Sequence, residues 1–386
     1  MCPPKKLEAL EQLGQWDAKE RDRALPVEEF KEKRRAVDEF KKWVELEEIF
    51  WRQKSRELWL KKGDKNTRSF HKMANAYRRR NFLKKLRVNG VCLERENSIK
   101  EGVAGAFQLL LSETGEWRPS MEGLTFNSLS HTNSAALEVP FSEDEVFSAF
   151  SSLGGDKAPS PEGFTLAFWQ KCWDVVKDEV LGFFGDFYES SCFKRSLNAT
   201  FVALVPKKGG AKELKDFRPI NLVGGLYKLL AKVLVNRLKW VVDSLVSDFQ
   251  HVFVGGRQIL DVVLIANEVI DSRLKASLRG LLCKLDIEKA YDHVNWNHLI
   301  AMMDKMGFGS KWLGWIRWCI SMIRFSILVN SSPFGFFSSC RGLKQEDPLS
   351  LYFFILVMEI LYCLISRAKD GDLLRVSELK RGMLRE

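Results

Sequence analysis

An apolar run ending on one carboxylate is the feature that most limits what this 386-residue chain can fold into. Residues 281–285 read Leu-Leu-Cys-Lys-Leu and lead directly to Asp286, and a helix-compatible segment with Tyr291 and Asp292 follows. The run predicts a short strand. A carboxylate at the end of a strand can hold a divalent metal, because the rigid strand fixes a hard oxygen ligand.

The bulk composition is typical of a globular protein that meets polyanions. Hydrophobic residues make up 46% of the chain and charged residues 28%, which argues against wholesale disorder. The net charge is +10, yet residues 51–90 alone hold fourteen Lys and Arg against two acidic residues, Glu57 and Asp64. Positive charge is therefore concentrated in one basic stripe, residues 51–90.

Aromatic side chains alternate with the cations of the basic stripe, which favours nucleic-acid contact through phosphates and stacked bases. The cations that we predict to bind nucleic acid here are Arg78, Arg79, Arg80, Lys84 and Lys85. A charged helical face whose aromatic residues point inward is the alternative interpretation.

The cysteines and the most apolar segment bear on location. The eight cysteines are scattered without a C-x-x-C pair, and the first residues lack the apolar core of a secretory signal. We expect reduced thiols in an intracellular protein, nuclear or cytoplasmic and not secreted. Residues 349–365 are apolar but shorter than the ~20 residues of a membrane span and include Glu359, so a buried helix beginning at Asp347-Pro348 is expected, with no membrane partner.

Periodicity predicts mostly helices, with a few strands. Apolar residues recur every seven positions from Phe30 to Leu58, which predicts one long amphipathic helix, either a weak coiled coil or a solvated helix docked by one stripe. Residues 112–140 are rich in Ser, Thr, Asn and Gly and predict a loop-rich linker. Further expected elements are a capped helix from Ser142, a strand over 198–208, helices within 168–190, 216–242, 260–274 and 312–320, and a hairpin over 325–339.

Five motifs follow one another in an order that resembles the reverse transcriptases of plant LINE-type (non-LTR) retrotransposons. They are KAPSPEGF (157–164), the segment 204–238, the segment 249–271, CKLDIEKAYDHVNW (283–296) and GLKQEDPLSLYFF (342–354). The resemblance covers roughly residues 45–368. It implies an α+β fold with a helical basic N-terminal extension followed by an incomplete right-hand polymerase, fingers and palm.

The resemblance also implies domain limits and partners. The expected parts are a helical basic extension (1–110), a linker (111–140), a fingers-like region (141–280), a partial palm (281–368) and a divergent tail (369–386). The implied activity is RNA-directed DNA synthesis with Mg²⁺, and the implied partners are an RNA template, a DNA primer and deoxynucleoside triphosphates.

Residue roles carry over at the matching positions. Asp286 would be the catalytic metal-binding carboxylate, and the carbonyl of Ile287 would complete a metal shell. Lys207 and Arg218 would hold the triphosphate. The remaining matched positions are Tyr291, which would reject a ribose 2′-hydroxyl, Gln345, near the incoming nucleotide, and Arg257, in the template-contacting segment. Taken singly, Tyr291 could be a core aromatic residue and Lys207 a turn lysine.

Several departures bear on activity. Glu346, Leu351, Ser160 and Glu162 replace the Gly, Pro, Gly and Asp of the family pattern, and no Asp-Asp dipeptide occurs in the 386 residues. We therefore expect a C-terminally truncated reverse transcriptase that is inactive as an isolated chain. The alternatives are a catalytically dead fragment that binds nucleic acid and a decaying reading frame.

Overall fold

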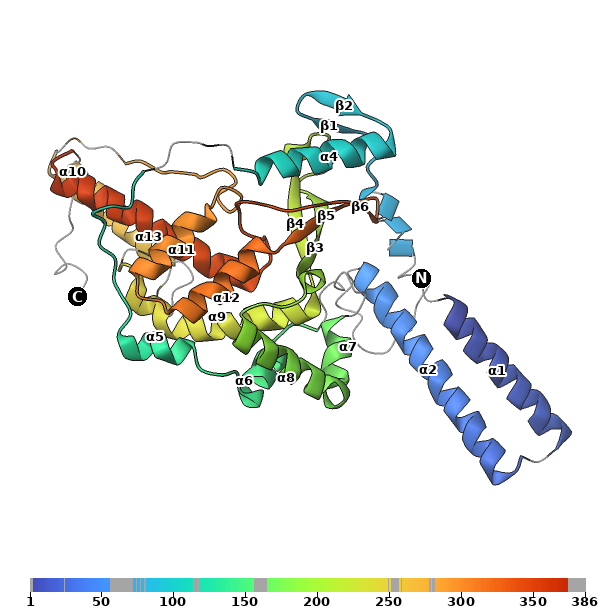
Figure 1. The fold of residues 1–386 in the computed structure, drawn as a ribbon. Coiled ribbons are helices and arrows are strands. Elements are labelled where there is room, and N and C mark those ends of the chain that lie inside the picture. The colour runs from blue at the N-terminus through green and yellow to red at the C-terminus, as the bar shows by residue number, and fades with distance from the viewer. Residues whose placement is uncertain are drawn as a thin grey trace. The chain divides into compact units, whose positions relative to one another are not determined.

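The computed structural model of the chain comprises two compact units, Met1–Leu83 and Lys84–Glu386, each described here by itself (Figure 1). The residues that the structure describes are 3–23, 25–55, 72–73, 75–76, 78–79, 81–113, 115, 119–155, 165–248, 250, 257, 259–277, 279 and 282–373. The KAPSPEGF motif lies outside the described residues.

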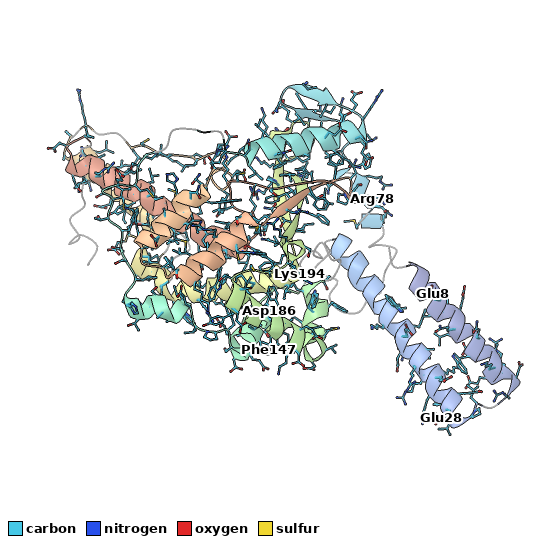
Figure 2. All side chains as sticks on the ribbon, in the orientation of Figure 1. Glu8, Glu28, Arg78, Phe147, Asp186 and Lys194 are labelled. Atoms are coloured by element: carbon cyan, nitrogen blue, oxygen red, sulfur yellow. The ribbon has the colours of Figure 1, made fainter. Side chains whose placement is uncertain are left out.

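The first unit contains a helical hairpin of α1 (Pro3–Asp22) and α2 (Val27–Ser55). The two helices run antiparallel, with Glu8 near the start of α1 and Glu28 near the start of α2 (Figure 2). The long helix predicted from Phe30 to Leu58 is confirmed by α2 as far as Ser55, and residues 56–58 lie outside the described residues; the separate helix α1 before it was not predicted. Pro26 explains the break, because proline cannot donate a backbone hydrogen bond and disfavours helical geometry in the residue before it.

The second unit contains a mixed four-stranded sheet with the strand order β4-β3-β5-β6. Its strands are β3 (Ala199–Pro206), β4 (Phe217–Val223), β5 (Arg324–Val329) and β6 (Ser332–Phe337). The pairs β3–β4 and β5–β6 are antiparallel, whereas β3 and β5 are parallel. The predicted strand over 198–208 and the predicted hairpin are confirmed, and the hairpin turns at Asn330 and Ser331, which both have positive φ.

Helices pack around α9 (Gly225–Leu245), whose buried positions include Leu229, Val233 and Leu238. The other helices of this unit are α4 (Glu96–Leu110), α5 (His131–Leu137), α6 (Glu143–Ser151), α7 (Leu166–Lys171), α8 (Trp173–Ser190), α10 (Ile259–Lys275), α11 (Trp296–Lys305), α12 (Ser310–Ser321) and α13 (Pro348–Asp370). The mixture of helix and sheet confirms the α+β class.

Residues 84–110, which were expected in the N-terminal extension, belong to the second unit. A two-stranded hairpin of β1 (Leu86–Val88) and β2 (Val91–Leu93) precedes α4, which packs against this hairpin and against β5 and β6. The expected linker 111–140 is also partly helical, since it contains α5, which is capped by Ser130 and buries Leu137. Their apolar residues are nevertheless largely buried, including Leu86, Ile99, Val103, Leu124 and Leu129. The remaining domain limits stay predictions.

Helix α13 is long and apolar enough to cross a membrane by length and composition. It packs against α9 and α11, and its buried residues include Leu349, Phe353 and Glu359. The Glu359 carboxylate accepts hydrogen bonds from the backbone N–H of Ser247 (3.0 Å) and from its hydroxyl (3.2 Å). The expected buried helix is confirmed, and the side chain of Asp347 caps its first turn.

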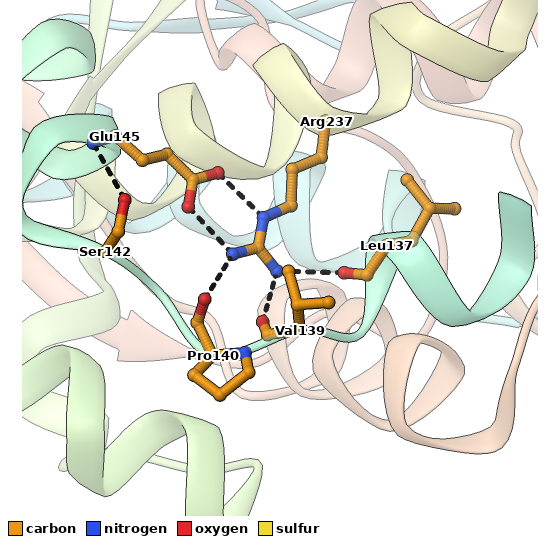
Figure 3. Close-up of polar contacts among 6 residues, drawn as sticks. All are labelled: Leu137, Val139, Pro140, Ser142, Glu145 and Arg237. Carbon is orange, nitrogen blue, oxygen red and sulfur yellow. Dashed lines mark hydrogen bonds and ion pairs between the residues drawn. The ribbon is translucent and has the colours of Figure 1, made fainter.

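A buried arginine ties α9 to α6 and to the segment before it (Figure 3). The guanidinium of Arg237, 1% exposed, donates to both carboxylate oxygens of Glu145 at 2.7 Å. It also donates to the carbonyls of Leu137 (2.9 Å), Val139 (2.7 Å) and Pro140 (3.1 Å). The chain between α5 and α6 is thereby held on α9 through side-chain contacts rather than through a sheet.

Candidate functional site

Two segments distant in sequence are held together by backbone hydrogen bonds. The N–H of Leu343 donates to the carbonyl of Tyr291, and the N–H of Gly342 donates to the carbonyl of Val294, both at 2.8 Å. The turn that carries Gln345 therefore lies beside the segment that carries Tyr291.

This close approach requires glycine at position 342. Gly342 has a φ of +91°, and a Cβ atom there would lie 2.8 Å from Leu111 Cδ2 and 3.0 Å from the carbonyl oxygen of Asp292. Asp292 itself is buried, and burial raises the pKa of its carboxyl group. Glycine at this position thus allows the two segments to meet.

A cavity of about 810 Å³ opens between β4, this paired region and the start of α13. Three sequence-predicted positions for nucleotide binding line it: Arg218 from β4, Tyr291, and Gln345. The predicted metal ligand Ile287 lines it as well. Residues that the sequence prediction missed are Lys289, Ala290, Lys344, Glu346, Asp347, Pro348, Ser350 and Leu351.

Tyr291 lines the cavity and also packs against α13. Its ring stacks on Phe354 of α13, with centroids 4.9 Å apart and planes 17° from parallel. Burial raises the pKa of its phenol, so the ring stays neutral at physiological pH. A neutral aromatic face fixed by stacking is suited to pack against a sugar or base.

Beneath the Gln345–Glu346 turn lies a buried polar cluster. Lys344, with a 2% exposed side chain, donates to Asn198 Oδ1 at 2.7 Å and lies 3.5 Å above the ring of Tyr227. The hydroxyl of Tyr227 donates to Asp347 Oδ2 at 2.8 Å, and Lys344 Nζ is 3.9 Å from the same carboxylate oxygen. Burial lowers the pKa of Lys344 to about 8. Because Lys344 and Asp347 flank the turn, the cluster fixes both of its ends.

Glu346 is an exposed residue on the wall of the cavity with a φ of +70°. A left-handed backbone at a non-glycine residue costs roughly 1–2 kcal/mol. The side chain adds a carboxylate to a cavity whose other charged lining residues include Arg218, Lys289 and Lys344. The negative charge opposes any polyanionic ligand that the cations attract.

Lys207 does not line this cavity. Its ammonium donates to the carbonyl of Lys215 at 2.9 Å, at the connection between β3 and β4. Its backbone N–H donates to the carbonyl of Asp216 at 2.8 Å. Lys207 thus lies where the alternative interpretation, a turn lysine, would place it, and its triphosphate role stays a prediction.

The strand expected before Asp286 is absent among the described residues, since 282–287 are irregular. The side chains of Leu282 and Leu285 are 71% and 68% exposed. A strand needs a hydrogen-bonded partner, and in the described part of the chain no strand pairs with this segment. Asp286 is exposed and does not line the cavity, although Ile287 does.

The donor set near Asp286 does not by itself make a two-metal centre. Within the described residues, no group of three or more His, Cys, Asp or Glu side chains lies close enough to share a metal ion. Asp286 and the Ile287 carbonyl offer two adjacent hard oxygens, whereas a two-metal site has to clamp both the attacking and the leaving oxygen. Asp286 and the Ile287 carbonyl alone therefore do not fit a two-metal catalytic site.

The cations predicted to bind nucleic acid fall in different places. Arg78 and Arg79 have exposed side chains in helical turns of the first unit, and Arg80 lies outside the described residues (Figure 2). Lys84 and Lys85 are exposed at the start of the second unit. Arg257 is half-buried and donates to the carbonyls of Ser247 (2.5 Å) and Gln250 (2.7 Å). Its guanidinium therefore stabilises the backbone that follows α9.

The sequence that forms the mixed sheet, the turn and the cavity is similar to known proteins. Residues 205–376 match the reverse transcriptase (RNA-dependent DNA polymerase) family. The chain is 26% identical, over 76% of its length, to the "Transposon TX1 uncharacterized 149 kDa protein" of Xenopus laevis. It is 24% identical, over 57% of its length, to a "Retrovirus-related Pol polyprotein from type-1 retrotransposable element R2" of Nasonia vitripennis.

The chain therefore contains a reverse transcriptase domain. Its relatives are proteins of non-LTR retrotransposons. The chain spans 22% and 21% of the length of the two relatives above. A shorter match, 46% identical over 43 residues, is to the "Uncharacterized mitochondrial protein AtMg01250" of Arabidopsis thaliana.

Proposed function

We propose that the cavity lined by Arg218, Tyr291 and Gln345 binds the incoming deoxynucleoside triphosphate of RNA-directed DNA synthesis. The observation that carries this proposal is the convergence of three positions, 218, 291 and 345, which sequence motifs had marked separately. An RNA template and a DNA primer are the partners that this reaction requires.

Each wall of the cavity supplies a different interaction. The Arg218 guanidinium can pair with phosphate oxygens through two parallel hydrogen bonds. The Tyr291 ring, held on Phe354, packs against the sugar and disfavours a 2′-hydroxyl by its bulk. Gln345, on the turn fixed by Lys344 and Asp347, offers an amide to the nucleotide or the template base.

The nucleotide assignment is tested by binding, which needs no turnover. A fluorescent deoxynucleoside triphosphate is titrated into the full chain, the Arg218→Ala variant and the control variant Arg195→Ala, which removes an exposed arginine outside the cavity. Loss of a charged hydrogen bond of about 1.5–3 kcal/mol should weaken binding by about tenfold to a hundredfold in Arg218→Ala only. Equal affinity in all three proteins would refute the assignment.

The sugar assignment has its own measurement. Removal of the ring in Tyr291→Ala should reduce the preference for a deoxynucleotide over the matching ribonucleotide, because the barrier to the 2′-hydroxyl is lost. The ratio of the two dissociation constants isolates this effect from any general loss of affinity. An unchanged ratio would assign Tyr291 to packing against Phe354 alone.

We further propose that the 386-residue polypeptide binds nucleotide and nucleic acid without synthesising DNA. Asp286, with Mg²⁺ as the expected ion, is its proposed metal ligand, but it lies on an irregular segment, and the described residues contain no group of three or more His, Cys, Asp or Glu that could hold a metal ion. Primer extension on an RNA template, with Mg²⁺ or Mn²⁺, should give no product. Synthesis that is abolished by Asp286→Ala would contradict this proposal.

We also propose that the chain derives from a plant retrotransposon and that it is located inside the cell. The match to the Arabidopsis protein supports the lineage, and the seven described cysteines, all free thiols, support a reducing compartment. Sequencing the flanking genomic DNA tests the lineage, and fractionation of cells that express a tagged chain tests the location.

A further inference from the structure

The turn formed by Gln345 and Glu346 has a strained backbone that the contacts at its two ends must hold. Glu346 has a φ of +70°, in the left-handed region that residues with a side chain rarely adopt. Such a conformation persists only where the surrounding structure determines it. Lys344 stands at one end of the turn and Asp347 at the other, where its carboxylate also caps α13. The placement of the Gln345 side chain in the nucleotide cavity therefore depends on what Lys344 and Asp347 contact.

Lys344 connects the turn to three other parts of the second unit. Its ammonium donates to Asn198 Oδ1, just before β3, at 2.7 Å. It lies 3.5 Å from the centre of the Tyr227 ring in α9 and 3.9 Å from Asp347 Oδ2 at the start of α13. The side-chain amide of Asn198 in turn donates to the carbonyl of Cys319 in α12 at 3.2 Å. One buried cation thus fixes the turn against β3, α9 and α13.

Among the described groups that face Lys344, Asp347 supplies the negative charge. The phenol of Tyr227 and the thiol of Cys319 are neutral, because burial raises the pKa of the phenol well above its ordinary value and that of the thiol to about 12. The Asp347 carboxylate favours the ammonium form of Lys344, but burial outweighs this attraction and lowers the pKa of Lys344 to about 8. Lys344 can therefore lose its proton at a mildly alkaline pH.

The protonation state of Lys344 affects the nucleotide cavity in two ways. Lys344 lines this cavity together with Arg218 and Gln345, so its ammonium adds positive charge to a site proposed for a polyanion. The charge acts strongly there, because a side chain that is 2% exposed is poorly screened by water. Loss of the proton removes this charge and also the attraction to Asp347, which holds the turn. Both changes weaken the binding of a triphosphate.

We propose that Lys344 is a positioning residue of the nucleotide cavity: its ammonium holds the turn formed by Gln345 and Glu346 in the binding geometry, and nucleotide binding is coupled to protonation of Lys344. This inference rests on the proposed function. The coupling is reciprocal, so a nucleotide that binds the protonated form more tightly also increases the affinity of Lys344 for its proton. Nucleotide affinity should be highest below about pH 8 and should fall above it, by at most about tenfold per pH unit.

The first experiment measures nucleotide affinity against pH at constant ionic strength. A fluorescent deoxynucleoside triphosphate is titrated into the full chain and into the Lys344→Met variant, from about pH 7, where a terminal phosphate is largely ionised, to about pH 9.5. Methionine keeps the unbranched stem of lysine and removes the ammonium. The matched control is Lys289→Met, the same substitution at an exposed lysine that lines the same cavity. Circular dichroism verifies that each variant is folded.

The three proteins should give different curves. The affinity of the original chain should fall by about tenfold between about pH 8 and 9.5. Lys344→Met should bind about tenfold more weakly at pH 7 and should show no such fall, so that the two curves converge at high pH. Lys289→Met should also bind more weakly, because it removes a cavity charge, but it should keep the fall above pH 8.

Two further measurements do not depend on the folding of Lys344→Met. Calorimetry of nucleotide binding to the original chain, in two buffers of different ionisation enthalpy, should detect the uptake of roughly half a proton per nucleotide near pH 8.5. The Asp347→Asn variant keeps a side chain that caps α13 and removes the charge that favours the ammonium. In this variant the fall in affinity should begin about one pH unit lower.

Parallel curves for the original chain and Lys344→Met, a flat curve for Lys289→Met, or binding without proton uptake would each overturn the inference. If binding depends on Arg218 and the curves are parallel, the proposed function stands and the role of Lys344 is refuted. If binding persists in Arg218→Ala and loses its pH dependence in Lys344→Met, the triphosphate role of Arg218 is refuted and Lys344 remains a positioning residue. Absence of nucleotide binding at every pH would refute both.

Discussion

Replacement of Arg237 by methionine should be the most destabilising single substitution at a polar residue of the second unit. Methionine keeps the unbranched apolar stem of arginine and deletes the guanidinium, so packing along α9 is largely preserved. The substitution removes five hydrogen bonds, two to Glu145 and one each to the carbonyls of Leu137, Val139 and Pro140 (Figure 3).

The magnitude follows from what is left behind. Among the described residues, Arg237 is the one ion-pair partner of the Glu145 carboxylate, whose side chain is 19% exposed, so the substitution leaves a partly buried charge. Breaking a buried ion pair from one side costs about 3–5 kcal/mol. Arg237 also lies 4.3 Å above the Phe141 ring, and this contact contributes about 1 kcal/mol more. We expect the free energy of unfolding to fall by about 4–6 kcal/mol.

Urea unfolding followed by tryptophan fluorescence measures this loss. Trp315 is buried with its ring 5.1 Å from that of Phe141, so its emission reports on the region that Arg237 holds. Arg317→Met, at an exposed position of α12, makes the same chemical change without a buried partner. The control should stay within about 0.5 kcal/mol of the original chain.

A double-mutant cycle distinguishes the ion pair from general packing. Glu145→Leu removes the other charge, and the double variant Arg237→Met with Glu145→Leu leaves neither charge buried alone. The double variant should be more stable than the sum of the single losses predicts, by about 1–3 kcal/mol. Additive losses, or a loss below about 1 kcal/mol in Arg237→Met, would refute the reasoning.

Three further substitutions test other parts of the structure. Gly342→Ala should cost about 2 kcal/mol of unfolding free energy, measured by urea unfolding, because of its φ of +91° and the 3.0 Å approach to the Asp292 carbonyl. The free energy of unfolding should rise as the pH increases from about 8 toward 10.5, because Lys344 loses its proton in the folded protein while it stays protonated in the unfolded chain. The Lys344→Met variant should lack this rise. Parallel curves of unfolding free energy against pH for the two proteins would contradict the lowered pKa of Lys344. Leu285→Asp should leave the melting temperature unchanged, since this leucine is 68% exposed, and a large loss would show that 282–287 packs as a strand.

Local signals predicted the elements that local contacts form. Asp347 followed by Pro348 predicted the start of α13, and the structure shows the Asp347 carboxylate accepting from the backbone N–H of Leu349. Ser142 similarly caps α6 by accepting from the N–H of Glu145. The second half of the expected capping box is absent at that site, because the Glu145 side chain turns to Arg237 instead. A partner 92 residues away in sequence is not visible in a local pattern.

Contacts between distant segments account for what sequence reasoning missed. Lys344 and Asp347 can fix the turn between them only because they contact Asn198 and Tyr227. Asn198 lies just before β3, and Tyr227 lies in α9. The contact of β1 with the connection between β3 and β4 depends on a backbone hydrogen bond between Arg87 and Lys212. Only the three-residue spacing of Lys344 and Asp347 around the turn was available as a signal in sequence.

The predicted site has two parts, the cavity lined by Arg218, Tyr291 and Gln345 and the segment that carries Asp286. Different contacts form them, which explains why the cavity is assembled and the predicted strand before Asp286 is not. The nucleotide cavity is assembled by contacts that the described residues supply, namely the Tyr291–Leu343 hydrogen bond, the cluster around Lys344 and the cap of α13. The segment before Asp286 depends on strand pairing, which the described residues do not supply, and its leucines remain exposed. Because the first set of contacts does not include Asp286, the proposed nucleotide affinity should not change in an Asp286→Ala variant. The segment around Asp286 thus lies within the region that matches the reverse transcriptase family, whereas the proposed nucleotide site rests on the geometry around Arg218 and Gln345.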